Sequence, residues 1–280
     1  MDETLFSIIV PTYNRPSLLL RALESLKRQT FGYFEVIVSD DGSSSDTGSV
    51  IASLEDNRFK LLHNSINTGA SDARNRAIES CVGSFISFLD DDDEFLPSFL
   101  SSTLLAFGMC PSSVACSWAN VCNVRYAENV SAGRDYTKYA LPTDSRIMPL
   151  DDCLTIGIGY GVTIRGDTLR KVGGFDSSFK LVEDTDLILK LISHGFRSTL
   201  VEEVCVNVHH HAGDRMTSVA LNNLRIRECW NLIRKHEKFL AENPNLRAQL
   251  VHGIRWLESG RACSSVDSTV IEVERDVAIE

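Results

Sequence analysis

The sequence lacks three features that would each point to a particular class of protein. Its eight cysteines include no C-x-x-C pair and no tight Cys/His cluster, which argues against a zinc-finger site. It has no run of about 18 apolar residues, the length that a membrane-spanning helix needs. Basic residues are few, 28 Lys and Arg against 38 Asp and Glu, which argues against non-specific nucleic-acid binding. We therefore expect a cytoplasmic protein with reduced thiols and no nucleic-acid partner.

The amino-acid composition is that of an ordinary globular protein. The 280 residues are 43% hydrophobic and 24% charged, and a chain of this length can bury a sizeable core. The formal net charge is −10. A polyanionic ligand must therefore be met locally, by a metal ion or by a few placed basic groups.

The first half of the chain alternates strand patterns with helix patterns. Short β-branched and aromatic runs predict strands at residues 6–10, 35–39, 58–63, 84–89 and 113–124. Helical spacing of apolar residues predicts helices at 17–29, 71–81 and 96–109. This alternation is typical of a mostly parallel sheet covered by helices, and three acidic or polar loops follow its strands. Ligands of open α/β sheets bind at those carboxyl ends.

The second half is less regular. Weak periodicity from about residue 126 to 152 predicts a loop-rich insertion. Further on, the patterns indicate helices at 166–172, 184–194, 218–240 and 245–258, and a strand at 199–208. We divide the chain into a main α/β domain, a helical C-terminal extension and an acidic, loosely held tail, with the boundaries 1–217, 218–260 and 261–280.

Four consecutive carboxylates, Asp90–Asp93, directly follow an apolar strand. Their mutual repulsion is of the order of 1 kcal/mol per close pair, and a bound divalent cation relieves it. Oxygen ligands alone favour Mg²⁺ or Mn²⁺. In an extended segment Asp90 and Asp92 point together and Asp91 points away. The simpler alternative is that Asp92 or Asp93 caps the helix expected near Pro97 and that the others are solvated.

Other polar residues have one chemical and one ordinary interpretation each. Asp41 can accept from a nucleobase or ribose, or merely form a turn. Arg74 can pair with phosphate, or with an acid on its own helix. Asp184 can act as a general base, or cap a helix. The run His209–His211 can bind a metal or have no function.

Seven short motifs occur in the order found in one enzyme family, and they cover about residues 5–217. The motifs are Val10–Asn14, Ser39–Ser43, Asn67–Gly69, Ala73–Asn75, Phe88–Asp93, Gly173–Asp176 and Glu183–Asp184. Through them the chain resembles the inverting family 2 glycosyltransferases with the GT-A fold. The resemblance implies an α/β architecture, a single mixed and mostly parallel sheet flanked by helices, with a helical C-terminal extension.

The resemblance also implies roles for residues that bind the nucleotide. Pro11 and Tyr13 would cradle the nucleobase, and Asp41 would accept a hydrogen bond from it. Arg74 would lie near the base or the diphosphate, and Asp91 near the ribose.

A bound Mn²⁺ or Mg²⁺ is implied as well. Asp92 would be its firmest ligand and Asp90 the next, and His211 would complete the shell, although His209 and His210 are equally near in sequence. Asp184 would be the catalytic base.

The expected reaction moves a sugar from a nucleotide-diphosphate sugar, with UDP as the default, to a saccharide or lipid-linked acceptor. The glycine-rich segment Gly157–Gly161 is interpreted as acceptor-site backbone. A nucleotidyltransferase is one alternative, although Pro11–Asn14 stands where such enzymes commonly have glycines. A non-catalytic sugar-nucleotide-binding protein is another. Between residues 225 and 238, five bases against two acids permit peripheral contact with an anionic membrane, or simply form a solvated helix face.

Overall fold

The computed structural model describes residues 5–127, 130–142, 145–148, 154, 157–210 and 219–260. Their strands form one sheet with the order β3-β2-β1-β4-β8-β6-β9-β5, and β7 pairs with β6 outside this path. The strands are β1 (Phe6–Thr12), β2 (Phe34–Asp40), β3 (Phe59–His63), β4 (Phe85–Phe88), β5 (Glu94–Phe95), β6 (Val114–Ala127), β7 (Val130–Thr137), β8 (Thr163–Arg165) and β9 (Arg197–His210). The helices are α1 (Pro16–Lys27), α2 (Thr47–Ala52), α3 (Ala70–Ser80), α4 (Phe99–Gly108), α5 (Gly166–Lys171), α6 (Glu183–Ser193), α7 (Asn222–Lys235), α8 (Glu237–Glu242) and α9 (Pro244–Glu258), and a 3₁₀ turn (Val219–Leu221) precedes α7.

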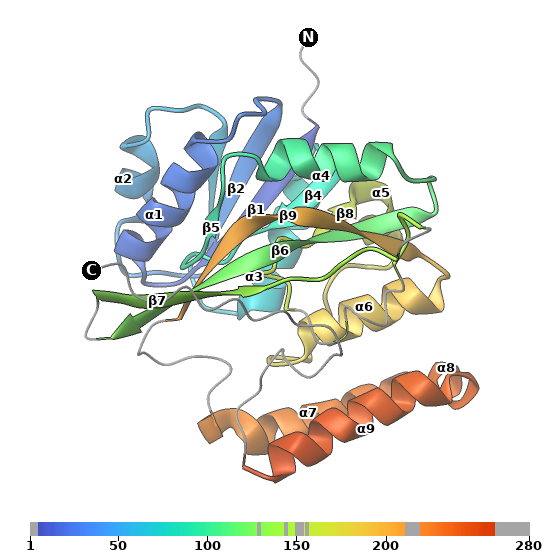
Figure 1. Cartoon of the computed structure of the whole chain (residues 1–280). Coiled ribbons are helices and arrows are strands. Elements are labelled where there is room, and N and C mark those ends of the chain that lie inside the picture. Colours follow the sequence, from blue (N-terminus) through green and yellow to red (C-terminus); the bar gives the residue numbers. More distant parts are fainter. Residues whose placement is uncertain are drawn as a thin grey trace.

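The sheet is mixed, and its parallel part holds the N-terminal strands. β2, β1 and β4 are parallel neighbours, and β3 is parallel to β2. β8 runs antiparallel between β4 and β6, and β9 returns parallel to β6. Figure 1 shows helices on both faces of this sheet, with α4 above it and α6 below it. The mixed, mostly parallel sheet expected from the sequence is confirmed.

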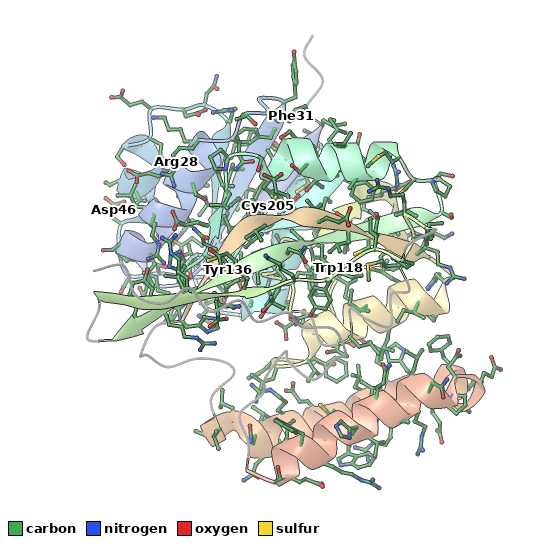
Figure 2. The ribbon with its side chains drawn as sticks, in the orientation of Figure 1. Arg28, Phe31, Asp46, Trp118, Tyr136 and Cys205 are labelled. Carbon is green, nitrogen blue, oxygen red and sulfur yellow. The ribbon has the colours of Figure 1, made fainter. Side chains whose placement is uncertain are left out.

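Two apolar layers hold the helices on the sheet. In β1, Phe6, Ile8 and Val10 pack into the layer shared with α1 and α4. Ile9 points to the opposite layer, where Trp118 of β6 meets the apolar faces of α3 and α6. Figure 2 shows Trp118 on the side of the sheet that faces α6. Because both faces are covered, the central parallel strands β1, β2 and β4 are mostly apolar, as buried strands of this type are.

Several predicted boundaries and one predicted loop differ from the structure. The expected loop-rich stretch is wrong over residues 126–127 and 130–137, since β6 continues to Ala127 and pairs antiparallel with β7. The last strand extends to His210, so part of the histidine run lies within it. The expected helix at 218–240 is two helices, α7 and α8, separated at His236. The acidic tail 261–280 lies outside the described residues.

The C-terminal helices lie under α6 (Figure 1). Leu232, Leu240, Leu246 and Ile254 from α7, α8 and α9 belong to the same apolar layer as the helices below the sheet. No helix within the described ranges is long and apolar enough to cross a membrane.

The start of β4 tests the packing of the parallel strands. A Cβ at Gly83 would lie 2.6 Å from the backbone N of Ser7 and 2.7 Å from the carbonyl carbon of Phe6. Gly83→Ala therefore forces β1 and β4 apart, and we expect it to lower the free energy of unfolding by about 1–3 kcal/mol in denaturant titrations. A Cβ at Gly32 meets nothing within 4 Å, so Gly32→Ala is the matched control. Equal stability of the two variants would contradict this packing.

Candidate active site

The ends of three parallel strands meet at one edge of the sheet. Thr12 at the end of β1 pairs with Asp40 at the end of β2, and Asp41 donates its backbone N–H to the Thr12 carbonyl at 3.0 Å. β4 runs parallel on the other side of β1 and leads directly into Asp90. The acidic loops after β2 and β4 therefore lie at the carboxyl ends of their strands, at one edge of the sheet, as the sequence predicts.

The acidic run forms a tight turn. The backbone N–H of Asp93 donates to the Asp90 carbonyl at 3.1 Å, so the expected extended conformation of Asp90–Asp93 is wrong. Asp91 is buried, and it accepts from the Thr12 hydroxyl at 2.7 Å and from the Arg15 guanidinium at 3.2 Å. Burial raises the pKa of Asp91 to about 6, against the effect of these two donors. The same Arg15 nitrogen lies 3.4 Å from Asp92, whereas Asp90 contacts Arg74, so the structure does not set Asp91 apart from Asp92 as expected.

A buried arginine links the acidic turn to α6. Arg74 of α3 donates to Asp90 at 3.0 Å and to Glu183, the first residue of α6, at 3.2 Å. Its guanidinium also lies 5.5 Å from the ring centroid of Phe175. Burial acts to lower the pKa of Arg74, but Asp90, Glu183 and Asp184 together hold it above its usual value. Arg74 is therefore a fixed positive charge among three carboxylates.

The pKa of Glu183 is raised as well, which favours the neutral form of this carboxyl group. Burial and the adjacent Asp184 carboxylate raise the pKa of Glu183, and Arg74 opposes this rise. The contact between Arg74 and Glu183 brings residues 109 positions apart in the chain into one site.

The remaining two acids of the turn have different surroundings. Asp92 lies 3.4 Å from Arg15, and its side chain keeps 24% of its exposure, while that of Asp90 keeps 38%. Asp93 is buried and accepts from the backbone N–H of His209 at 2.9 Å. The alternative in which Asp92 or Asp93 caps the next helix is wrong, since α4 begins at Phe99 without a side-chain cap.

Asp184 lies against the glycine-rich segment. Its Oδ2 accepts from the backbone N–H of Ile158 at 3.0 Å, and a Cβ built on Gly157 would lie 3.6 Å from the same oxygen. A Cβ built on Gly159 would lie only 2.7 Å from Oδ2 of Asp90. One turn of backbone thus contacts both carboxylates, and the absence of a side chain at Gly159 leaves Asp90 its place.

The expected nucleobase residues lie at the same edge. Tyr13 follows β1 and is 46% exposed, and Pro11 is half-buried. Asp41 is buried and accepts from the backbone N–H groups of Thr68 and Gly69 at 3.0 and 2.6 Å. Burial acts to raise the pKa of Asp41, but these bonds hold it below its usual value. Asp41 therefore orders the loop beside it, and its contact with a base stays a proposal.

The histidines have protein partners where the structure describes them. His209 is buried, with Nε2 at 2.8 Å from Glu94 and Nδ1 at 2.7 Å from the Tyr126 hydroxyl. His210 Nε2 lies 2.9 Å from the side-chain oxygen of Asn123. His211, the expected metal ligand, lies outside the described residues.

The donor set suits a hard divalent cation that shares its ligands with a substrate. Asp90 and Asp92 each present a partly exposed carboxylate at one turn. No group of three His, Cys, Asp or Glu side chains in the described part of the chain converges at metal-binding distance. Mg²⁺ typically takes one or two carboxylates and completes its shell with water and phosphate, so two carboxylates fit this requirement.

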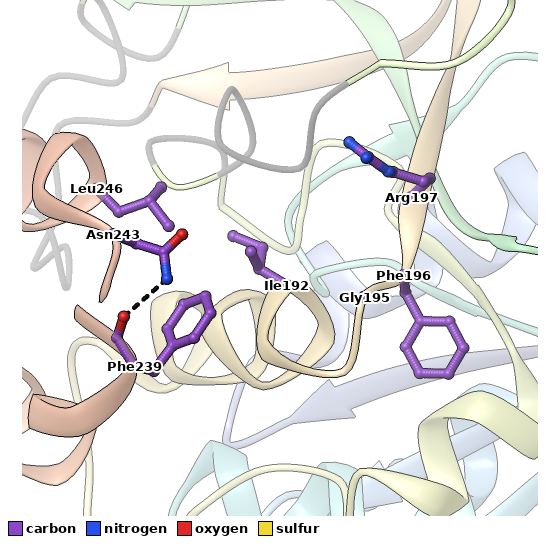
Figure 3. Close-up of a pocket in the computed structure, with 7 residues that line it drawn as sticks. All are labelled: Ile192, Gly195, Phe196, Arg197, Phe239, Asn243 and Leu246. Carbon is purple, nitrogen blue, oxygen red and sulfur yellow. Dashed lines mark hydrogen bonds between the residues drawn. The ribbon is translucent and has the colours of Figure 1, made fainter. Parts of the chain in front are cut away.

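A separate cavity of about 290 Å³ lies at the opposite end of α6 from Asp184. Its lining includes Phe196, Phe239 and Leu246 and contains no carboxylate. In Figure 3 the side-chain amide of Asn243 donates to the Phe239 carbonyl beside it, at 2.8 Å. We place the chemistry at the strand ends, because that is where the charged groups converge.

Sequence reasoning missed two residues that shape the site. Thr12 and Arg15 hold Asp91, and Arg15 also approaches Asp92. Thr12 is inside the first motif and Arg15 directly follows it, so proximity to a recognised motif was the available signal.

Comparison with known proteins assigns this arrangement to a family. The profile of the family described as glycosyl transferase family 2 matches residues 7–172, more than half of the chain. The chain is a family 2 glycosyltransferase. Membership decides against the nucleotidyltransferase alternative.

Two relatives resemble this glycosyltransferase in sequence over very different lengths. WcaA of Escherichia coli K12, a glycosyl transferase named provisionally for colanic acid biosynthesis, is 29% identical over 91% of this chain and 89% of its own. WfgD of Escherichia coli, a UDP-Glc:α-D-GlcNAc-diphosphoundecaprenol β-1,3-glucosyltransferase, is 40% identical over 36% of this chain. This match spans only 40% of the length of WfgD.

The fold of this glycosyltransferase also occurs in a solved enzyme complex. The mannosyltransferase PcManGT of Pyrobaculum calidifontis, in complex with GDP-Man and Mn²⁺, superposes with a TM-score of 0.62 at 19% identity. The superposition covers 91% of this chain and 72% of that one. This likeness establishes the GT-A architecture and does not identify a substrate.

Gly159 provides a test of the site geometry. Gly159→Ala pushes its Cβ against the movable end of the Asp90 side chain, so the fold survives while the carboxylate is displaced. We expect unchanged thermal stability and about tenfold weaker binding of UDP in the presence of Mn²⁺ by calorimetry, which corresponds to one displaced polar ligand. Gly157→Ala, whose Cβ makes only an ordinary contact, is the control. Wild-type affinity in Gly159→Ala would show that Asp90 does not contribute.

Proposed function

We propose that this glycosyltransferase moves a sugar from a nucleotide-diphosphate sugar to an acceptor hydroxyl in one inverting, metal-dependent step. The observation that carries the proposal is the convergence of Asp90 and Asp184 around Arg74 and the Gly157–Gly161 turn, with Asp92 in the same acidic turn as Asp90. This arrangement supplies separate acidic groups for a leaving diphosphate and for an incoming hydroxyl.

Asp92 and Asp90 would hold Mn²⁺ or Mg²⁺. The ion supplies positive charge that offsets the negative charge developing on a diphosphate leaving group. Arg74 and Arg15 keep the two carboxylates in place at the turn. A relative of this fold in complex with GDP-Man and Mn²⁺ supports the assignment.

Asp184 would act as the general base. Its carboxylate takes the proton of the acceptor hydroxyl as the hydroxyl oxygen attacks the anomeric carbon, and the nucleoside diphosphate leaves from the opposite face. One displacement inverts the configuration at that carbon. The Ile158 N–H bond holds Oδ2 of Asp184 and fixes its orientation.

The first candidate for the nucleoside of the donor is uridine. Pro11 and Tyr13 would lie beside its base, and Asp41 would accept a hydrogen bond from that base. Asp91 would lie toward the ribose and Arg74 near the diphosphate. The name of WfgD specifies UDP-Glc as donor and a diphosphoundecaprenol-linked acceptor, which supports both a UDP-sugar and a lipid-linked saccharide. The complex of PcManGT holds GDP-Man, so guanosine is the second base to test.

Release of nucleoside diphosphate tests this function. The wild-type enzyme, given a panel of UDP- and GDP-sugars with Mn²⁺ and lipid-linked acceptors, should release nucleoside diphosphate in step with glycosylated product. Asp184→Asn should lower turnover by about 10²- to 10⁴-fold, the usual contribution of a general base, and leave nucleotide affinity unchanged. Turnover near the wild-type rate in Asp184→Asn would contradict the assignment of the base.

We also propose peripheral membrane contact through the outer face of the C-terminal helices. Arg227, Trp230 and Arg234 follow helical spacing on α7 and are exposed, Trp230 by 40%. Two of the five bases counted in the sequence are not available, since Arg225 is buried and Lys235 is paired with Asp176 and Asp186. Exposed bases beside a tryptophan suit an anionic lipid surface, at about 1 kcal/mol per base.

Co-sedimentation with vesicles tests this contact. Vesicles of phosphatidylcholine with phosphatidylglycerol should retain the protein at low salt, and vesicles of phosphatidylcholine alone should not. The double variant Arg227→Gln/Arg234→Gln should bind about tenfold or more weakly, as loss of two surface charges implies. Arg134→Gln/Lys171→Gln has the same change in net charge on other surfaces and is the control. Equal retention of both double variants would place the contact elsewhere.

A further inference from the structure

The segment in front of Asp184 is held by a side chain from the C-terminal extension. Glu228 of α7 is 6% exposed, and its carboxylate accepts from the backbone N–H of Leu181 at 2.9 Å and of Lys180 at 3.1 Å. Residues 179–182 have no helix or strand to satisfy their backbone groups. Backbone N–H groups outside a helix or strand need other acceptors, and here the Glu228 carboxylate accepts from two of them.

α6 begins without a cap of its own. Val182 is its N-cap residue, and no side chain there accepts from the first backbone N–H groups of the helix. Glu183 and Asp184 are the first two residues of that helix. The position of Asp184 therefore depends on how the preceding residues are fixed, and Glu228 bonds to the two that directly precede Val182.

The same α7 also binds the chain beyond Asp184. Asp186 is fully buried, and it accepts from Lys235 Nζ at 2.6 Å and pairs with His236 Nε2 at 2.8 Å. Lys235 reaches Asp176 as well, at 2.6 Å. These bonds, together with those of Glu228, attach α7 to the base-bearing segment before and after Asp184. Figure 1 shows α7 directly beneath α6.

We propose that Glu228 is a positioning residue for the base, and that α7 sets the orientation of Asp184 toward the acceptor through residues 180–186. The proposal rests on the assignment of Asp184 as the base. α7 lies outside the residues 7–172 that the family profile covers. The C-terminal extension is accordingly part of the catalytic apparatus.

Hydrogen–deuterium exchange of the full-length protein tests the physical part of the proposal without any substrate. Glu228→Ala should speed exchange in peptides that contain the amides of Lys180 and Leu181 by about tenfold or more, since hydrogen bonds to a charged group are lost. Peptides from β1 and β2 should not change. Glu237→Ala, an exposed glutamate on α8, is the matched control. Unchanged exchange at residues 180–181 in Glu228→Ala would overturn the proposal.

Steady-state kinetics test whether Glu228 affects the rate of sugar transfer through the position of Asp184. Glu228→Ala should lower kcat by about 10- to 100-fold, the scale of a misplaced catalytic group, with donor KM within about twofold of the wild type. Glu228→Gln should recover most of kcat, because its amide oxygen can take the place of the carboxylate oxygen that accepts from both N–H groups. Wild-type kcat in Glu228→Ala, or equal loss in the Gln and Ala variants, would overturn the positioning role.

The exchange and kinetic experiments together distinguish a failure of the positioning role of Glu228 from a failure of the proposed glycosyl transfer. If Glu228→Ala does not fold, Lys235→Gln replaces it in the exchange measurement, with raised exchange expected in residues 176–186. A wild-type enzyme that transfers no sugar from any donor would contradict the function, and the exchange result would still decide whether α7 fixes the segment.

Discussion

The site depends on one buried guanidinium. Arg74 brings its charge from α3 to the junction of two segments, the acidic turn at Asp90 and the start of α6 at Glu183. Without it, these carboxylates would be driven apart by their own repulsion and by the cost of burial. Breaking a buried charge cluster of this kind typically costs about 3–5 kcal/mol, because the remaining charges are left uncompensated. Arg74 is thus both a structural link and the reason that the proposed metal and base positions lie close together.

The acidic turn shows how the protein distributes four negative charges. The sequence alone suggests a divalent cation as the relief for Asp90–Asp93, but protein groups already supply much of it. Arg74 meets Asp90, Arg15 meets Asp91 and Asp92, and the His209 backbone N–H meets Asp93. The side chains of Asp90 and Asp92 stay partly exposed, and the proposed cation would use their oxygens in a shell that a diphosphate helps to complete.

The N-terminal strands and their loops were predictable, because β1, β2 and β4 are short, mostly apolar runs and acids follow β2 and β4 at the sheet edge. β7 was not, since Gly133 and the polar residues around it follow no strand pattern and the strand exists only by pairing with β6. Glu228 escaped prediction for a similar reason. Its partners lie 47 and 48 positions earlier in the chain, and a buried glutamate on a helix resembles any surface glutamate until the packing is known. The motif Glu183–Asp184 singled out Asp184 in the sequence. The hydrogen bond from the backbone N–H of Ile158 to Asp184 could be found only in the structure.

A crystal structure of the full-length protein with UDP and Mn²⁺ tests the central claim, that Arg74 gathers one site from the acidic turn and the start of α6. The anomalous signal of manganese should lie about 2.0–2.2 Å from carboxylate oxygens of Asp92 or Asp90, the usual distance of small hard cations from oxygen ligands. The diphosphate should bind that ion, and Asp184 should face the side where the sugar would extend. Nucleotide bound instead in the cavity beside Phe196 and Phe239, or manganese remote from Asp90 and Asp92, would contradict the account.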